Sequence, residues 1–242
     1  MIKKIATLLI LLLTTQVSYA AIAFDTAVAE TSTNGVTSKT ISITTSGSNR
    51  ILWAIMGQST SVTSSGCTYN SAAMTLATTT AHQFGARLNL YYIIAPSLGA
   101  NSLTCSVSGA SNISLGAISF TGADQTTQPD AVSAATTTGT VSYSQSVTSV
   151  ADNSFAVLGL FAQSGATLTG GSNTTIGSQP EVTAYGTAFA YSTSGKTPPG
   201  TFTLNVTSAS QNFSGVMASF KPAFSTSTTP STAGFFRMLK YR

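Results

Sequence analysis

Charged side chains are scarce in this sequence, since Asp, Glu, Lys and Arg make up 7% of its 242 residues, against about 25% in a typical soluble domain. Half of the ten positive charges lie at the two ends of the chain, and these are Lys3, Lys4, Arg237, Lys240 and Arg242. The remaining five accompany six acidic residues, so the body of the chain is almost neutral. A nucleic-acid-binding domain carries a clustered basic patch. We therefore expect no nucleic-acid partner.

Long apolar runs are also missing. The longest covers residues 5–13, whereas a transmembrane helix needs about 20 apolar residues. Two lysines precede this run, and Ser18 and Ala20 follow it as the small residues that a signal peptidase reads. The pattern predicts a signal peptide over residues 1–20 with cleavage after Ala20, the alternative being a retained anchor. We expect an exported protein that is extracellular, at the cell surface or periplasmic, with no transmembrane span once the signal is removed.

Cysteine is limited to Cys67 and Cys105. Exported chains reach an oxidising compartment, where disulfides form and persist. Strand alternation puts Cys105 on the same face as Leu103 and Val107, which we expect to be the core face. The sequence favours a disulfide between the two cysteines. The alternative is a pair of separate buried thiols that behave as small hydrophobic side chains.

Helical periodicity is absent after the signal, and alternation of apolar and polar residues takes its place. In residues 87–95 it puts Leu88, Leu90 and Tyr92 on one face. Residues 51–56 and 155–161 are more continuously apolar, which is typical of central strands in a two-layer core. Turn-forming clusters separate these runs. The sequence predicts an all-β fold, an antiparallel β-sandwich of jelly-roll type with about twelve strands.

The chain also repeats itself. Residues 41–58 are echoed by residues 147–163, and residues 103–120 by residues 202–220. Both echoes have an offset near 100 residues. They predict an internal duplication, although any two hairpins share alternation and a polar turn.

We place the pseudo-repeats at about residues 37–124 and 139–223, within one sandwich domain over residues 21–223. Two small stacked sandwiches are the alternative arrangement. The polar stretch 122–139 is expected to be poor in strands and is the only candidate boundary.

Four short strings carry a resemblance to a known group of domains: residues 21–25, 68–76, 90–96 and 117–127. They resemble widespread bacterial and phage-associated exported domains that are similar to concanavalin-like or laminin-G-like jelly rolls. The resemblance covers about residues 21–223. It implies a jelly-roll fold and an extracellular setting, and it transfers no catalytic residue.

Catalytic patterns are lacking. The single histidine, His82, is expected to be a solvated turn residue, and no serine lies in a Gly-x-Ser-x-Gly elbow. The six acids do not form a pattern that would place two carboxylates in one groove, as glycoside hydrolysis requires. We predict no catalytic residue, no cofactor and no enzymatic activity. The resemblance leaves a weak calcium site open at Asp124, Gln125 and Asp130, with turn capping as the default.

Aromatic side chains provide the candidate ligand-facing residues. We expect Tyr69, Tyr91, Tyr143 and Tyr185 to be exposed aromatics that could contact a glycan, with packing at the edge of the core as the alternative. Trp53 lies in a mostly apolar strand and is expected in the core.

The last segment, residues 224–242, is a Ser/Thr-rich linker that ends in a basic and aromatic tail. Its candidate docking residues are Phe235, Phe236, Arg237, Lys240 and Arg242. Such a tail could bind a partner or an anionic membrane surface, or it could be a frayed end without a role.

These features together predict a non-enzymatic, exported surface module of adhesion or appendage type, with a surface glycan or a protein as its partner. The alternative is a structural or decoration protein of a phage or extracellular particle, and the least favoured function is that of a jelly-roll carbohydrate-active enzyme. Oligomerisation is left open.

Overall fold

The computed structural model describes residues 17–82, 85–162, 167–179 and 186–226. These ranges form fifteen β-strands and contain no α-helix. The strands are β1 (Val17–Tyr19), β2 (Ala23–Thr45), β3 (Ile51–Ser59), β4 (Ser64–Tyr69), β5 (Ala72–Ala73), β6 (Thr75–His82), β7 (Ala86–Ile94), β8 (Gly99–Thr121), β9 (Ala131–Thr148), β10 (Phe155–Ala162), β11 (Thr169–Gly170), β12 (Thr174–Ser178), β13 (Gly186–Ser192), β14 (Thr201–Phe220) and β15 (Phe224–Thr226). The predicted all-β antiparallel class is confirmed. Four strands of two or three residues raise the number above the twelve expected.

Two long strands organise the first half of the molecule. The early part of β2 pairs with the end of β8, and the later part of β2 pairs with the beginning of β8. Register shifts between Glu30 and Ser38 separate the two parts, as expected where β-bulges bend a strand. One end of β8 also pairs with β3 and the other with β4. Both long strands therefore pass from one layer, in which β8 pairs with β3, into a second layer, in which β8 pairs with β4. We call these layers the inner sheet and the outer sheet.

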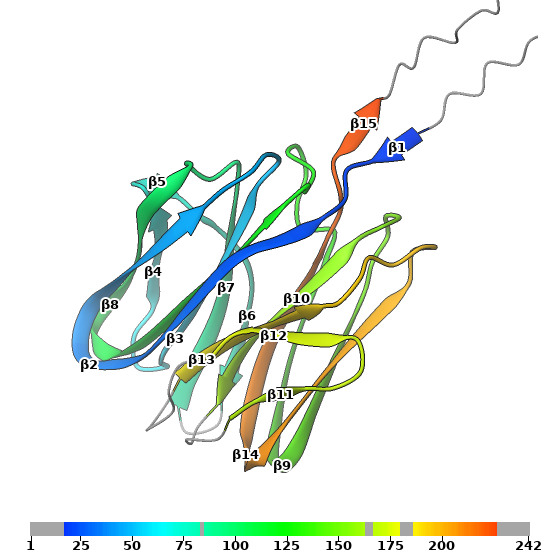
Figure 1. The fold of residues 1–242 in the computed structure, drawn as a ribbon. Helices are drawn as coiled ribbons and strands as arrows, with labels where there is room; N and C mark the ends of the chain where they lie inside the picture. The colour runs from blue at the N-terminus through cyan, green and yellow to red at the C-terminus, as the bar shows by residue number, and fades with distance from the viewer. Residues whose placement is uncertain (1–16, 83–84, 163–166, 180–185, 227–242) are drawn as a thin grey trace, which may run out of the picture.

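The second half repeats this plan. Five strand pairs of the first half have a counterpart in the second half. The pair β2–β8 corresponds to β9–β14, β3–β8 to β10–β14, β3–β7 to β10–β13, β4–β8 to β11–β14, and β6–β7 to β12–β13. The registers correspond too, because Ile51 lies opposite Phe120 and Phe155 lies opposite Phe220. The pairings thus repeat at the offset of the sequence echoes. Figure 1 shows the two groups of strands packed against each other.

Three hydrophobic clusters fill the space between the sheets. One lies inside the first half, one lies inside the second half, and a third is shared between the halves. In β3, Ile51, Trp53 and Ile55 enter the shared cluster, whereas the alternate residues enter the cluster of the first half. Both faces of this strand are therefore buried, which explains its continuous apolar sequence. Trp53 is fully buried, as predicted.

At the shared cluster, glycines allow the two halves to approach closely. A Cβ on Gly159 would lie 2.5 Å from Ile55 Cδ1, and a Cβ on Gly57 would lie 2.9 Å from the Phe161 ring. Ile55 and Gly159 occupy corresponding positions of the two halves, and so do Gly57 and Phe161. Each half supplies a glycine where the other supplies a large side chain.

The disulfide between Cys67 and Cys105 is present, so the prediction of a bridge is confirmed. The two residues lie directly opposite each other on β4 and β8. Both are buried in the cluster of the first half. The bridge links an outer-sheet hairpin to the long strand β8.

The N-terminal residues join the body near the predicted cleavage site. The amide of Ala20 donates to Ala223 O at 2.9 Å, and Ile22 is buried in the shared cluster. The preceding strand β1 pairs only with β15, and both project from the body (Figure 1). The described residues include no helix that is long and apolar enough to cross a membrane.

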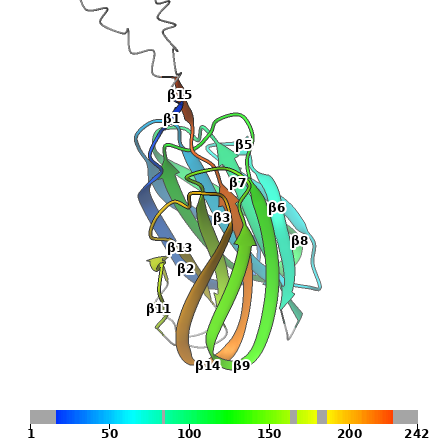
Figure 2. The same ribbon diagram turned by 90° about the vertical axis from the view of Figure 1, so that its right-hand side faces the viewer.

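The polar stretch proposed as the boundary between the halves contains more strand than the sequence predicts. Residues 122–139 were expected to be poor in strands, but β9 already begins at Ala131. Its Thr- and Ser-rich sequence has alternating burial, so one face of the strand is solvated although the strand is fully formed. In Figure 2, β9 lies beside β6 of the first half, and contacts between the two strands agree with this view.

Candidate binding cavity

Three of the four tyrosines expected at the surface are buried: Tyr69, Tyr91 and Tyr143. The prediction of exposure is wrong for them because each half has its own core. The Tyr69 hydroxyl donates to Ile43 O at 3.2 Å. Tyr91 Oη lies 2.6 Å from Ser64 Oγ, and burial raises the pKa of Tyr91. These three side chains are structural and do not form a ligand platform.

Tyr143 shows how deeply such a ring is enclosed. Its hydroxyl donates to Ala135 O at 3.0 Å and lies 2.5 Å from Gln145 Oε1. Burial raises the pKa of Tyr143. The fourth candidate, Tyr185, lies outside the described residues, as do the docking residues Phe235, Phe236, Arg237, Lys240 and Arg242.

One carboxylate oxygen of each acid in the weak calcium candidate, Asp124 and Asp130, accepts hydrogen bonds within the fold. Asp124 Oδ1 accepts from the amides of Thr126 and Thr127, each at 2.9 Å. Burial opposes ionisation of Asp124, but these hydrogen bonds outweigh it and lower the pKa of the carboxyl group. The other candidate carboxylate, that of Asp130, accepts from the amide of Val150 at 2.8 Å. Both carboxylates cap loops, as the default interpretation predicts.

His82 is not the solvated turn residue that we expected. It ends β6 with 6% of its surface exposed, and its Nδ1 lies 2.5 Å from Ser214 Oγ on β14. Its ring also packs edge-on against Phe161. Burial lowers the pKa of His82, so the imidazole is neutral at pH 7. The histidine connects the two halves because β6 belongs to one and β14 to the other.

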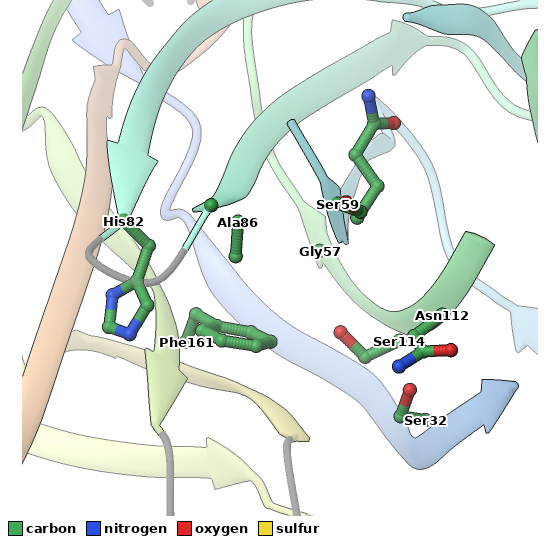
Figure 3. A pocket seen from close by; sticks show the side chains of 10 residues that line it. Ser32, Gly57, Ser59, His82, Ala86, Asn112, Ser114 and Phe161 are labelled. Atoms are coloured by element: carbon green, nitrogen blue, oxygen red, sulfur yellow. The ribbon is translucent and has the colours of Figure 1, made fainter. Parts of the chain in front are cut away.

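A cavity of about 170 Å³ lies at this end of the shared cluster. Strands of both halves contribute to its wall, with His82 and Phe161 on one side and Ser32, Asn112 and Ser114 on the other (Figure 3). Asn112 is exposed whereas Ser114 is 1% exposed. The wall therefore includes both surface residues and residues that belong to the core.

Ser114 provides the main polar group at the inner end of the cavity. Its hydroxyl has no hydrogen-bond partner among the described residues, and Figure 3 shows it directed toward the space in front of Phe161. A Cβ on the neighbouring Gly57 would lie 2.5 Å from Ser114 Oγ. Ser114 Oγ and the Phe161 ring therefore fill the space beside this glycine. A buried hydroxyl without a partner is costly, and Ser114 Oγ has less than 1 Å² of surface open to the cavity.

None of the described residues that line the cavity is charged at pH 7. The wall offers hydroxyl, amide and imidazole groups beside one aromatic ring. Glycoside hydrolysis through paired carboxylates has no counterpart in this wall. Ser214 is fully buried, which makes it a poor nucleophile for an incoming substrate although it contacts His82. The wall has the chemistry of a binding site for a neutral molecule.

The two outer sheets present a second notable surface. On β2 and β8, Thr40 Oγ1 lies 2.7 Å from Thr104 Oγ1. On β9 and β14, Ser146 Oγ lies 2.8 Å from Thr203 Oγ1. These pairs belong to rows of outward residues that are almost all Ser or Thr. Each half therefore has an uncharged, hydroxyl-covered outer face stabilised by cross-strand pairs.

Sequence reasoning missed the cavity, although the echoes contained a signal for it. Residues 112–120 are echoed by residues 212–220, so Ser114 corresponds to Ser214. Gly57 pairs with Ser114, and Phe161 pairs with Ser214. The first half thus has a glycine where the second half has a phenylalanine, and Phe161 packs beside Gly57. The alignment of the two repeats shows this difference, but it does not show which residues line the cavity.

Comparisons with protein-family models, with curated proteins and with solved structures found no match to this chain. The resemblance to concanavalin-like and laminin-G-like domains stays a prediction.

Proposed function

We propose that this protein is an exported, non-enzymatic surface module of adhesion or appendage type. The observation that carries the proposal is the pair of uncharged, hydroxyl-covered outer faces on a body closed by a buried disulfide. Disulfides are typical of proteins that work outside the cytoplasm. Hydroxyl groups keep these sheets hydrated with almost no charge, which suits a durable domain at a cell surface.

The position of the N-terminus supports the export step. The chain enters the body at Ala20 and Ile22, next to the predicted cleavage site. Cleavage after Ala20 would remove β1 and leave Ile22 in the shared cluster. The body of the sandwich is therefore compatible with the proposed processing.

A neutral glycan is the ligand class that we favour. Support comes from the uncharged cavity with its hydroxyl, amide and aromatic groups, in place of the tyrosines expected from the sequence. Binding sites for small molecules combine an apolar wall with a few convergent polar groups. Here Phe161 provides the apolar part, and Ser32, Ser59 and Asn112 provide the polar part.

A structural role in an extracellular particle is the second candidate. It is favoured by β9, an eighteen-residue strand that contains no charged residue or proline. Within the described ranges β9 forms a ladder with β14 and with no other strand, although it also contacts β6. Long edge strands without such residues are suited to pairing with another chain. In that case the outer faces would serve assembly, with the tail as a further contact.

A glycan array separates the two candidates. The mature chain, residues 21–242, is compared with a version that ends at residue 223. We expect both to bind neutral glycans, because the cavity lies within the shared part. Silence of both proteins on the array would contradict the glycan-binding proposal. Loss of self-assembly on removal of the tail would favour the structural role.

A further inference from the structure

We infer that the start of β14 is a docking edge for an extended acidic peptide of a partner protein. The peptide would add a strand beside Thr201 and Thr203 and place a carboxylate near Lys196. A pocket of about 310 Å³ lies along this edge, and both threonines are exposed. It shares no lining residue with the cavity beside His82. The site would therefore act whether or not that cavity binds a glycan.

The edge of β14 beside this pocket is covered only over part of its length. β11 pairs with Val206 and Thr207, and the amide of Gly171 donates to Asn205 O at 2.8 Å. The amide of Asn205 faces the same side, where it donates to Thr174 Oγ1 at 3.0 Å. Among the described residues, no ladder continues along this edge toward the start of β14.

The backbone groups of Thr203 and Thr201 face this open edge. Alternate residues of an antiparallel strand direct their amide and carbonyl groups to the same side, so both threonines share the side of Asn205. Toward β9, Thr203 Oγ1 lies 2.8 Å from Ser146 Oγ. Such close side chains are typical of the pairs in a ladder that exchange no backbone hydrogen bond. The amides and carbonyls of the two threonines are therefore available to an added strand.

The first half shows the same edge in its occupied form. In the sequence echo, Thr104 of β8 corresponds to Thr203 of β14. Thr104 is covered by β4, because it pairs with Thr68. The ladder continues with the amide of Asn70, which donates to Ser102 O at 3.0 Å. β4 has six residues whereas β11 has two. The second half therefore lacks the strand that fills this place in the first half, and an extended peptide could supply it by strand addition.

Lys196 determines the charge of the ligand. Its Nζ lies 5.8 Å from the centre of the Phe202 ring in the pocket wall, and the other lining residues are uncharged. The ion pair found among the described residues joins Lys39 to Glu30 and does not involve Lys196. A peptide carboxylate would complement this cation, whereas a basic peptide would be repelled. The charge therefore argues against the basic C-terminal tail of this chain as the occupant.

The test uses the ¹⁵N-labelled mature protein and a set of peptides of alternating Thr and Val, residues that favour strands. Each peptide has one Glu at a different position, and a control set has Gln in its place. We expect at least one Glu peptide to shift the amide signals of Thr201 and Thr203. It should bind about two- to fivefold more tightly than its Gln counterpart, as is usual for an exposed ion pair. The absence of shifts with every peptide would overturn the inference.

A lysine variant then tests the carboxylate contact. Lys196→Gln should lower the affinity for the Glu peptide to that for the Gln peptide, and it should leave the Gln peptide unaffected. Lys221→Gln is the matched control, because Lys221 lies outside the pocket, where it donates to Thr127 Oγ1. It should change neither affinity. If Lys196→Gln weakens both peptides equally, or neither, the assignment of an acidic ligand is wrong.

A proline variant tests the edge itself. Proline is tolerated where the N–H of a strand faces an open edge, so Thr203→Pro should keep cooperative thermal unfolding and bind the peptides no longer. Thr104→Pro, at the corresponding position covered by β4, should be strongly destabilised. Peptide binding by Thr203→Pro at wild-type affinity would contradict strand addition. Unfolding of Thr203→Pro as severe as that of Thr104→Pro would show that the edge is not open.

Two other occupants give different results. Acetate carries a carboxylate without a peptide backbone, so shifts of Thr203 with acetate as large as those with the peptide would overturn strand addition. Shifts of the Thr201 and Thr203 amides that depend on protein concentration alone would identify a second copy of this chain as the occupant, and the partner peptide would then be wrong.

Discussion

The residues at the shared cluster make the two halves complementary although their strand plans are alike. Ile55 fills the space beside Gly159, and Phe161 fills the space beside Gly57. If both halves carried the large residue, the sheets could not approach. If both carried glycine, a void would remain and the contacts across it would be lost. Divergence at these positions therefore explains how the two sheets pack closely.

The first prediction concerns the contact between Gly159 and Ile55. Gly159→Ala places a Cβ 2.5 Å from Ile55 Cδ1, and such overpacking costs about 1–3 kcal/mol of unfolding free energy. Ile55→Val removes that Cδ1 atom. In a urea-unfolding cycle, the double variant should therefore be more stable than the sum of the single effects allows.

Gly109→Ala is the control for this cycle. A Cβ at that position meets only Val62 Cγ1 at 3.4 Å, an ordinary contact. Its unfolding free energy should stay near that of the wild type. Strict additivity of Gly159→Ala and Ile55→Val would contradict the proposed close approach.

A second prediction at the residue scale concerns pH. Burial holds the pKa of His82 below its ordinary 6.5. The unfolded chain therefore takes up a proton at a pH where the folded chain does not, and stability falls as the pH drops through 6.5 and below. His82 is the only histidine. His82→Gln, which can still bond to Ser214, should remove this part of the pH dependence in urea titrations between pH 8 and 5. An unchanged profile in the variant would show that another group is responsible.

At the scale of strands, the sequence predicted the class of the fold and several faces correctly. Leu88, Leu90 and Tyr92 of β7 all pack on the shared cluster, as alternation requires. The prediction is wrong for the opposite face of β7. Tyr91 was expected at the surface, yet it is buried in the cluster of the first half. Alternation shows which residues share a face, but it does not show that a second sheet covers the other face.

The cavity could not be predicted from the sequence, for a related reason. Its wall combines Phe161 of β10 with Ser114 of β8 and His82 of β6. These residues are brought together by the packing of the two halves, and no local spacing links them. The sequence predicts a turn residue because the histidine lies just before a predicted strand. Its partner Ser214 is 132 residues away.

The disulfide was predictable because alternation placed Cys105 on the core face. We predict that Cys67→Ala combined with Cys105→Ala lowers the unfolding free energy by about 4 kcal/mol, the chain-entropy value for a loop of this length. Urea unfolding measures the difference. A reducing agent should lower the stability of the wild type and leave the double variant unchanged. Equal stability of oxidised wild type and variant would mean that the bridge contributes little to the fold.

For the whole molecule, the shared cluster determines cooperativity. It contains Trp53 and Ile55 from the first half and Val157 and Val216 from the second. Neither half could expose this surface to water without a large loss of hydrophobic stabilisation. The two halves should therefore behave as one folding unit in spite of their repeated strand plan.

This leads to a prediction for equilibrium unfolding in urea. Fluorescence of Trp53, the single tryptophan, should follow the same transition as hydrogen exchange of the β13 amides in the second half. Coincident transitions are the sign of a two-state process. Two separated transitions would contradict a shared core and would indicate independent stacked sandwiches.

We propose that this chain works outside the cytoplasm as a surface module. The most direct test is mass spectrometry of the protein released by shaving or washing intact cells. The account predicts a chain that begins at Ala21, with Cys67 and Cys105 joined. A full-length chain found only inside the cells, beginning at Met1 and with both thiols reduced, would contradict it.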